Sequence, residues 1–440
     1  MIVMKFGGSS VESAGAIARV AGIVRDRVDR KPVVVVSAMG KTTNRLLEMA
    51  QLAVEGKREE AQARLAEWRT YTDEIAYAFD ARAELASEYH ELPELLRGLA
   101  VLGEITPRSW DAIASYGERI SSKVVAKALG ALHVDARDFL VTDERHSQAQ
   151  PLYAPTYERL QHLPKAGLIV MGGFIGATEK GVTSTLGRGG SDFTASIIGA
   201  GLNAEEIQIW TDVDGMLTAD PRIHPGGHRV KTISFAEAAE LAYFGAKVLH
   251  PSTVLPAVEK NIPVLILNSR RPEVEGTRIV AKSVPCLNPV KSIACKTGIV
   301  LVNIQSTRML MAHGFLRRIF EVFDRFETSV DMVATSEVSV SLTIDNAARL
   351  DAITAELAQI AEVTVERDHA IVCLVGENLR ETPGVGARAF DSIKGINIRM
   401  ISQGASLVNI SFVLAQSDLH TAVAALHQEF FSTLDPAVFE

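Results

Sequence analysis

The chain has 440 residues, too many for one ordinary hydrophobic core, so we expect two or three domains. Hydrophobic residues make up 47% of the sequence and charged residues 22%, a balance typical of a well-packed soluble protein. The 45 Lys and Arg residues against 53 Asp and Glu residues give a formal net charge of −8. This charge argues against nucleic acid as a partner, and no dense run of Lys and Arg contradicts it.

Cysteine usage and the N-terminus bound the cellular compartment. Cys286, Cys295 and Cys373 lie far apart without the spacing of a metal site, which fits a reducing compartment. The N-terminus shows no basic segment followed by a long apolar stretch, and no apolar run approaches about 20 residues. We therefore expect neither a signal peptide nor a membrane partner, and we expect a cytoplasmic location.

Several short apolar runs in the first part of the chain end abruptly in Gly, Ser, Thr or Asp. They are IVMKFGGSS, PVVVVSAMGKTTN, GLIVMGGFIG, IQIWTDVDG and IPVLILNS. Runs that are apolar at every position are typical of strands buried on both faces, with helices covering the sheet. Residues 46–130 are rich in Ala, Leu, Glu and Arg and predict a helical stretch inside this α/β domain. In open α/β sheets ligands bind at the edge where such strands end, so a binding site is expected there.

The stretch KFGGSS ends the first of these strands with one lysine and two glycines. Lys5 can reach ligand phosphates as a point charge, and Gly7 and Gly8 let backbone N–H groups approach the same oxygens. Ser9 or Ser10 then starts a helix, whose N-terminus favours anions. Taken alone, the stretch is explained equally well by an ordinary turn with a serine N-cap.

The stretch STLGRGGSDFTAS is denser in Gly, Arg and Asp than a plain turn requires. The planar guanidinium group of Arg188 suits a carboxylate or a phosphate. Gly189 and Gly190 expose backbone N–H groups, and Ser191 or Asp192 would cap the helix that follows. We favour a ligand-binding loop over a capped turn with a solvated arginine.

Two later segments add groups that suit a nucleotide. WTDVDGMLTADPR places Thr211, Asp212 and Asp214 after a strand, where carboxylates can contact a nucleotide or its Mg²⁺. Arg222 and Lys247 can both pair with phosphate. Several such groups without an evident general base predict phosphoryl transfer, which relies on positioning and charge neutralisation. A carboxylate acceptor is already ionised at pH 7 and needs no base.

The last third of the chain contains an internal repeat. Residues 268–290 are polar and carry three prolines, so we place a domain boundary there. The segments that begin at Gly314 and Gly384 share one order: a glycine, an amphipathic helix, a strand, a turn, an alternating strand and a second helix. This order predicts the β-α-β-β-α-β, ferredoxin-like arrangement. The second copy lacks a closing strand, so we expect residues 291–297 to complete it, with the first copy inserted.

Together these motifs resemble aspartate kinase, of the amino acid kinase family. The segments that carry the resemblance are KFGGSSV, VVSAMGKTTN, YGER, GRGGSDFTAS, WTDVDGMLTADPR, FGAKVLHP and TSEVSVSLTID, in the expected order over nearly the whole chain. The chain looks most similar to the monofunctional, lysine-sensitive bacterial type, whose tail units are ACT domains that sense amino acids. The resemblance implies the amino acid kinase fold, an open and mainly parallel sheet between helices, over residues 1–280. It implies one ACT domain over residues 299–368 and another over residues 290–298 plus 369–440.

The resemblance also implies an activity and a set of site residues. The reaction is ATP + L-aspartate → ADP + 4-phospho-L-aspartate, the first step toward lysine, methionine and threonine, with Mg²⁺ accompanying ATP and no tightly bound metal. The implied catalytic residues are Lys5, Gly8 and Asp192. The implied substrate-binding residues are Ser37, Thr43, Glu118, Arg188, Gly189, Gly190 and Ser191. The implied nucleotide contacts are Lys5, Gly7, Gly8, Ser10, Thr211, Asp212, Leu217, Arg222, Lys247 and Val248. Among these, Arg188 is assigned to the substrate α-carboxylate, and Glu118 or Asp192 to its ammonium group or the phosphoryl region.

The ACT tail implies feedback inhibition by an end-product amino acid that binds at a dimer contact. The implied effector contacts are Met309, Gly314, Phe315, Leu316, Ser329, Val330, Asp331 and Glu337. Lysine is favoured as the effector, but Met311 and Ala312 stand where lysine-inhibited relatives carry polar residues, which leaves threonine open. We expect a homodimer through the ACT domains, with a tetramer left open. The alternative functions are another amino acid kinase activity and a catalytically silent amino-acid sensor.

Overall fold

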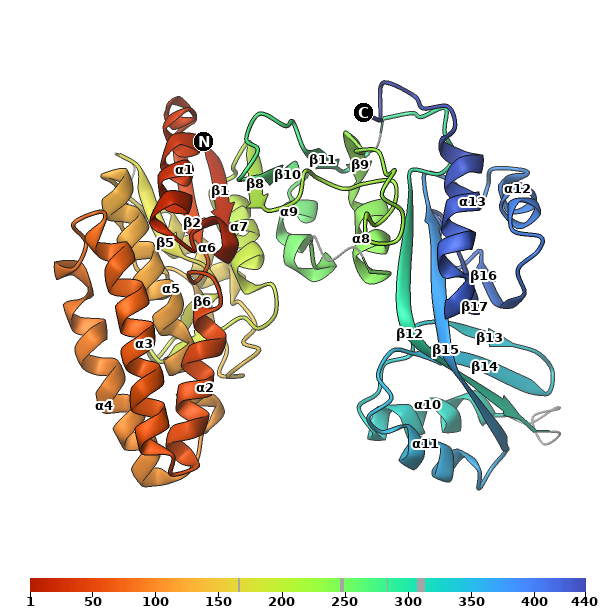
Figure 1. Cartoon of the computed structure of the whole chain (residues 1–440), viewed down its shortest axis with the longest axis horizontal. Coiled ribbons are helices and arrows are strands. Elements are labelled where there is room, and N and C mark those ends of the chain that lie inside the picture. Colours follow the sequence, from red (N-terminus) through yellow and green to blue (C-terminus); the bar gives the residue numbers. More distant parts are fainter. Residues whose placement is uncertain (165–166, 246–248, 283, 307–312) are drawn as a thin grey trace. The chain divides into compact units, whose positions relative to one another are not determined.

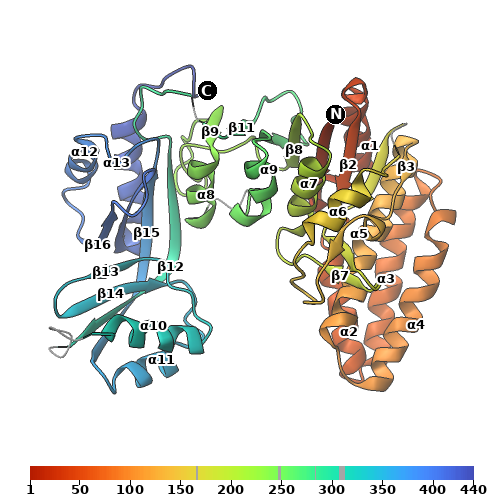
Figure 2. The ribbon, with the colours of Figure 1, turned by 180° about the vertical axis from the view of Figure 1, so that it is seen from behind.

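The computed structural model describes residues 1–164, 167–245, 249–282, 284–306 and 313–440 of the chain. The chain divides into two compact units, drawn in Figures 1 and 2. The first unit comprises Met1–Met216 and Val248–Lys282, and the second comprises Leu217–Lys247 and Ser283–Glu440. Within the described ranges, no helix is long and apolar enough to cross a membrane.

The first unit is built on a mainly parallel sheet whose strands follow the order β3-β5-β2-β1-β8-β10-β11 (Figure 1). The strands are β1 (Ile2–Phe6), β2 (Pro32–Val36), β3 (Leu132–His133), β5 (Ile169–Gly172), β8 (Glu206–Thr211), β10 (Val264–Asn268) and β11 (Thr277–Val280). All neighbouring pairs are parallel except β10 and β11. Every residue of β1 and β2 is buried, as runs that are apolar at each position predict. The expectation of an open, mainly parallel sheet is confirmed.

Helices cover both faces of this sheet. They are α1 (Ala14–Arg25), α2 (Thr42–Val54), α3 (Arg58–Tyr77), α4 (Ala86–Leu102), α5 (Pro107–Leu129), α6 (Tyr153–Leu160), α7 (Gly190–Gly201) and α9 (Leu255–Glu259). Ile2, Met4 and Phe6 of β1 share one hydrophobic core with α1, α2, α4 and α5. Lys5 alternates with them and points to the other face, where it pairs with Asp192 of α7. The predicted helical region of residues 46–130 is confirmed as α2 to α5, which stand side by side in Figure 2.

A small second sheet in the same unit is formed by strands that follow α5 in the chain. It is formed by β4 (Val141–Thr142), β6 (Ile175–Thr178) and β7 (Thr183–Thr185), in the order β4-β6-β7. Asp111 of α5 anchors this region, because its carboxylate accepts hydrogen bonds from the Thr185 hydroxyl at 2.5 Å and from the Ser147 N–H at 3.0 Å. β7 leads directly into the Gly-Arg-Gly-Gly loop that precedes α7. The anchor therefore fixes the start of that loop.

The second unit contains an antiparallel sheet with the strand order β13-β14-β12-β15-β17-β16. Its strands are β12 (Ser292–Gln305), β13 (Val333–Thr335), β14 (Ser339–Ile344), β15 (Glu362–Val375), β16 (Ile398–Gln403) and β17 (Asn409–Ala415). Its helices are α10 (Phe315–Arg325), α11 (Leu350–Leu357), α12 (Val385–Ser392) and α13 (Leu419–Phe431). The unit also includes β9 (Thr232–Ser234) and α8 (Phe235–Tyr243), which come from the middle of the chain.

Strands β12 and β15 each run through both halves of this sheet. Residues 301–305 pair with 362–366, whereas residues 292–296 pair with 371–375, and two register shifts separate the two stretches. The first half follows the β-α-β-β-α-β order along the chain, and the second is completed by residues 292–296 of β12, as expected, so the predicted ferredoxin-like units are confirmed. The fusion of the two units into one continuous sheet was not predicted, because a repeat pattern shows the units but not how their edge strands meet.

A fully buried ion pair joins α8 to the start of β12. Lys291 Nζ lies 3.1 Å from Glu237 Oε1, and both side chains are 0% exposed. Glu237 also accepts hydrogen bonds from the N–H and hydroxyl of Ser234, closing a capping box at the start of α8. The pair therefore ties the segment from the middle of the chain into the sheet of the second unit.

We expect Lys291→Met to lower the free energy of unfolding of the second unit by about 3–5 kcal/mol, because it leaves a buried carboxylate without its cation. Urea denaturation followed by circular dichroism measures this. Lys394→Met is the matched control, since Lys394 is 80% exposed and its loss should change the free energy by less than about 0.5 kcal/mol. Equal midpoints for the two variants would show that the buried pair adds no stability.

Candidate active site

A cavity of about 320 Å³ opens in the first unit where β1 and β2 end and α2 and α7 begin. Its lining residues are Lys5, Gly8, Ser37, Ala38, Gly40, Thr43, Glu118, Phe174, Gly187, Gly189, Gly190, Ser191 and Asp192. The position is the strand edge at which open α/β sheets bind ligands. Two helix N-termini meet there, and their partial positive charges favour an anionic group.

Lys5 supplies the cation of this cavity. Its Nζ lies 2.6 Å from Oδ1 of Asp192, and the two side chains are only 10% and 15% exposed. Asp192 stands in the first turn of α7, where the helix dipole stabilises a carboxylate. The pair holds the ammonium group of Lys5 at the cavity wall. A phosphate in the cavity would compete with Asp192 for the same ammonium group.

Glu118 supplies a buried carboxyl group to the same cavity, and its charge when ionised is opposite to that of Lys5. It comes from α5, is 4% exposed, and its Oε1 accepts a hydrogen bond from the Ala38 N–H at 3.0 Å. Its Oε2 is buried and has no hydrogen-bond partner among the described residues. Burial raises the pKa of Glu118 to about 8. A cation placed beside Oε2, such as the ammonium group of an amino acid, would give it a partner and favour its charged form.

Close packing explains several of the glycines around the cavity. A Cβ atom at Gly8 would lie 2.8 Å from the Ala38 carbonyl oxygen. Gly189 has a left-handed backbone, with φ of 73°, and a Cβ there would lie 2.8 Å from Cγ2 of Thr253. Larger residues would therefore displace the backbone that lines the cavity. The close contacts are with the protein's own residues, so the approach of these glycines to a ligand stays a prediction.

Among the residues predicted from KFGGSS and from the Gly-rich loop, Gly7, Ser10 and Arg188 are not part of the cavity lining. The N–H of Gly7 donates to the Trp210 carbonyl oxygen at 3.0 Å, which ties it to the sheet. Ser10 is buried, and its hydroxyl lies 2.7 Å from that of Ser269. Arg188 is exposed, although the glycines that flank it, residues 187 and 189, both line the cavity.

The residues predicted to contact the nucleotide divide between the two units. Thr211 is the last residue of β8 and Asp212 follows it; because β8 pairs with β1, both lie at the same strand edge as Lys5. Leu217 and Arg222 belong to the second unit, where the guanidinium group of Arg222 donates to both carboxylate oxygens of Asp220. Lys247 and Val248 lie outside the described residues.

The effector residues predicted from the sequence lie in the second unit, and Asp331 is the most constrained of them. Its Oδ1 accepts from Lys296 Nζ at 2.6 Å and from the Tyr243 hydroxyl at 3.1 Å. The side chain is 2% exposed, and its Oδ2 has no hydrogen-bond partner among the described residues. Burial raises the pKa of Asp331. Like Glu118, it is a buried carboxyl group that an added cation would satisfy.

The other predicted effector residues surround the first helix and second strand of the repeat. Gly314 is the left-handed N-cap of α10, and Phe315 is buried in the core of that half. Val330 packs against the same core. Leu316, Ser329 and Glu337 are exposed. Met309, together with Met311 and Ala312, lies outside the described residues.

Four lining residues were not predicted from the sequence: Ala38, Gly40, Phe174 and Gly187. Ala38 and Gly40 follow the β2 run directly, and Gly187 adjoins the predicted Gly-rich loop, so their neighbours in sequence pointed to them. Phe174 lies two residues beyond β5, within the run GLIVMGGFIG, but its residue type did not indicate a binding role. It adopts a left-handed φ of 64°, which is uncommon for a bulky residue, and its N–H donates to the Thr194 hydroxyl.

Comparison with known proteins identifies the family. A family model described as the amino acid kinase family matches residues 1–268, and an ACT domain model matches residues 372–430. Aspartokinase 1, chloroplastic, of Arabidopsis thaliana is 39% identical over 98% of this chain and 80% of its own length. Lysine-sensitive aspartokinase 3 of Escherichia coli (strain K12) is 36% identical over 98% of this chain and 99% of its own length.

Solved structures agree with this comparison. The crystal structure of E. coli aspartokinase III in complex with lysine and aspartate, in the T-state, matches with a TM-score of 0.84, 36% identity and coverage of 98% of this chain and 99% of that one. The R-state structure with aspartate and ADP matches with a TM-score of 0.82 at the same identity, covering 98% and 100%. The chain therefore belongs to the amino acid kinase family. Within that family it belongs to the aspartokinases, so the resemblance drawn from the motifs and the enzyme class it implied are confirmed.

Proposed function

We propose that the cavity of the first unit is where this aspartate kinase binds L-aspartate and transfers the γ-phosphoryl group of ATP to it. The observation that carries the proposal is the pairing of opposite charges across one cavity. Lys5 offers a cation to a phosphate, and Glu118 offers a buried carboxyl group to an ammonium. An amino acid acceptor and a phosphoryl donor need both.

In the proposed reaction, a side-chain carboxylate oxygen of L-aspartate forms a bond to the γ-phosphorus of ATP. The bond from that phosphorus to the bridging oxygen breaks, and ADP leaves with the electron pair. The attacking carboxylate is ionised at pH 7, so no residue has to remove a proton. Lys5 neutralises charge on the transferring phosphoryl oxygens, while Asp192 holds the Lys5 side chain in place. Gly8 and the first turn of α7 offer backbone N–H groups to the same oxygens.

We assign the substrate ends by charge. Glu118 binds the ammonium group of L-aspartate, and Arg188 binds its α-carboxylate through the planar guanidinium fork. Ser37, Thr43 and Ser191 line the cavity between these groups and supply hydroxyl groups. Because Arg188 is exposed next to Gly187 and Gly189, its long side chain would have to turn toward the cavity when the substrate binds.

ATP serves as the cosubstrate, and ADP is bound in the E. coli relative with aspartate. We propose that Mg²⁺ accompanies it. Among the described residues no group of three or more His, Cys, Asp or Glu side chains is arranged to hold a metal ion. Mg²⁺ on a nucleotide takes most of its ligands from phosphates and water and needs only one or two carboxylates. Asp192 at the cavity meets that requirement. The nucleotide roles of Thr211, Asp212 and the residues of the second unit stay predictions from the sequence.

We propose that the second unit senses an end-product amino acid, with lysine favoured over threonine. A relative at 36% identity is named as lysine-sensitive, and its T-state structure contains lysine. The pairing of residues 292–296 with 371–375 supports ACT domain boundaries at 299–368 and at 290–298 plus 369–440. A homodimer through these domains, a cytoplasmic location and a place at the start of lysine, methionine and threonine synthesis belong to the same proposal.

We expect Asp331→Asn to raise the lysine concentration that gives half-maximal inhibition by at least about 10-fold. The amide cannot neutralise an ammonium group, and a charged hydrogen bond of about 1.5–3 kcal/mol is lost. Titration of ADP release with lysine, with threonine and with both measures this. Asp351→Asn is the control, because Asp351 is exposed on α11. Flat curves for wild type with every effector would remove the inhibition claim.

Coupled ADP release tests the activity itself. We expect turnover with ATP and L-aspartate, and none with L-glutamate, N-acetylglutamate or UMP. Turnover with only one of the other acceptors would show that L-aspartate is not the substrate and would favour another amino acid kinase activity. Absence of turnover with all four, together with lysine binding, would favour a silent amino-acid sensor.

A further inference from the structure

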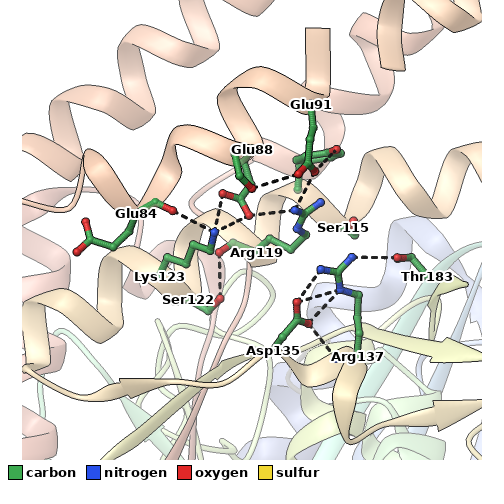
Figure 3. A network of polar contacts seen from close by, with 12 residues as sticks. Glu84, Glu88, Glu91, Ser115, Arg119, Ser122, Lys123, Asp135, Arg137 and Thr183 are labelled. Carbon is green, nitrogen blue, oxygen red and sulfur yellow. Dashed lines mark hydrogen bonds and ion pairs between the residues drawn. The ribbon is translucent and has the colours of Figure 1, made fainter. Parts of the chain in front are cut away.

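A largely buried network of charges lies on the α4 side of α5 (Figure 3), and it includes Arg119, the residue that follows Glu118 in the sequence. Arg119, the next residue along α5, places Nη2 3.0 Å from Glu88 Oε1 and 3.1 Å from Glu91 Oε2, both on α4. Its guanidinium carbon lies 4.5 Å from the centre of the Tyr116 ring. The Arg119 side chain is 11% exposed and that of Glu88 is 1% exposed.

A second cation of α5 reaches the same buried carboxylate. Lys123, one turn beyond Arg119, places Nζ 2.7 Å from each oxygen of Glu88 and 3.0 Å from the Glu84 carbonyl oxygen. Figure 3 shows Arg119 and Lys123 pointing at Glu88 from successive turns of one helix. Two cations of α5 therefore bind the Glu88 carboxylate, and these directional hydrogen bonds fix α5 to α4.

The opposite side of α5 is packed with little clearance against the cavity strands. Ser121 donates to the carbonyl oxygen of Ser37, a lining residue, at 2.7 Å. A Cβ atom at Gly172 would lie 3.1 Å from the Glu118 Cβ. Because a helix with its side chains has a radius of about 5–6 Å, a rotation of α5 by about 10° would move the Glu118 carboxyl by about 1 Å. Misplacement on that scale is enough to change rates by orders of magnitude.

We propose that Arg119 is a positioning residue for the amino-acid substrate: its Nη2, bonded to both Glu88 and Glu91, fixes the rotation of α5 that keeps Glu118 in the cavity. The inference rests on the proposed function, because it assigns Glu118 to the substrate ammonium group. Lys123 neutralises Glu88 as a point charge, but Arg119 adds a planar group bonded to two carboxylates and stacked on Tyr116. Directional bonds of this kind specify one arrangement of helices more than they add stability.

The role predicts a separation between the two substrates. Arg119→Met should raise the KM for L-aspartate by about 10- to 100-fold and leave the KM for ATP within twofold, because α5 contributes Glu118 and not the phosphate-binding groups. Arg119→Lys, which keeps the charge and loses the planar group over the Tyr116 ring, should lie between wild type and Arg119→Met. Lys127→Met is the matched control. Lys127 lies on α5, as Arg119 does, and pairs with Glu84, but it is 42% exposed. Both KM values should therefore stay within twofold.

A double-mutant cycle separates positioning through Glu118 from general weakening. If Arg119 acts through Glu118, Arg119→Met should add less than about twofold to the KM for L-aspartate in a Glu118→Gln background. Multiplication of the two single effects would overturn the proposal, as would equal increases in the KM for both substrates. If Arg119→Met does not fold, Glu91→Gln provides the second route. Glu91 is 46% exposed, and its loss should raise the KM for L-aspartate about threefold or more without leaving a buried charge.

The same assays distinguish failure of this inference from failure of the proposed function. Wild-type protein without aspartate-dependent ADP release would refute the proposed function. An active wild type whose Arg119→Met and Lys127→Met variants bind L-aspartate equally well would refute the positioning role alone.

Discussion

Replacing Lys5 by methionine should lower kcat by about 10³-fold. Lys5 is the cation that lines the cavity at the end of β1, and preorganised charge of this kind is worth about 10²–10³ in kcat. The substitution also leaves Asp192 without its partner, so that its carboxylate repels the phosphates. Steady-state kinetics at saturating ATP and L-aspartate measure the effect.

Lys180→Met is the control for Lys5→Met, because Lys180 is 77% exposed and pairs with Glu144 at the surface. Its kcat should stay within twofold of wild type. A Lys5→Met variant that folds and retains kcat within tenfold of wild type would remove Lys5 from the phosphoryl-transfer step. The cavity would then need another source of positive charge.

Glu118→Gln should raise the KM for L-aspartate by about 10²-fold at pH 8, because the amide cannot pair with the substrate ammonium group as a charged carboxylate does. Burial raises the pKa of Glu118 to about 8 in the free protein. The wild-type KM for L-aspartate should therefore fall as the pH rises from 6 to 8, while that of Glu118→Gln stays level. A pH profile with the same slope for both proteins would contradict the assignment.

The raised pKa of Glu118 also predicts how the stability of the protein depends on pH: stability falls over the range in which substrate binding improves. Between its ordinary value of 4.5 and the folded value of about 8, the native chain holds a proton on Glu118 that the unfolded chain releases. Stability from this group is complete below pH 4.5 and is lost as the pH rises to about 8, at a slope of at most about 1.4 kcal/mol per pH unit. Glu118→Gln lacks this loss, so its melting temperature should exceed that of wild type at pH 8 by more than at pH 5. An equal difference between the melting temperatures of the two proteins at pH 5 and at pH 8 would show that burial does not raise the pKa of Glu118.

Much of the site was predictable from the sequence, because residues that bind ligands directly follow apolar runs that form buried strands. An uninterrupted apolar run predicts a buried parallel strand, and the residues that follow it must lie at one edge of the sheet. Lys5 and Ser37 meet at the cavity for this reason, whereas the Gly189–Asp192 stretch follows β7 of the small sheet and was predicted from its density of Gly, Arg and Asp. Glu118 joined them through the motif resemblance, since a position within a long helix gives no sign of which strand edge it faces.

What escaped prediction depends on contacts between distant segments. The pairing of Lys5 with Asp192, and the burial of Glu118 Oε2 without a hydrogen-bond partner among the described residues, arise only when α5 and α7 pack against the sheet. The left-handed backbone of Phe174 is set by its surroundings and not by its side chain. Likewise, the anchor of Arg119 on Glu88 joins residues that sequence patterns treat as solvated charges on two separate helices.

Trapping of the product tests the central claim most directly. Wild type and Lys5→Met are incubated with ATP, Mg²⁺, L-aspartate and hydroxylamine, which converts an acyl phosphate into a stable hydroxamate. Wild type should yield aspartyl hydroxamate on the side-chain carboxyl, and Lys5→Met should yield at least about 100-fold less. Hydroxamate on the α-carboxyl, or equal yields from the two proteins, would contradict the central claim.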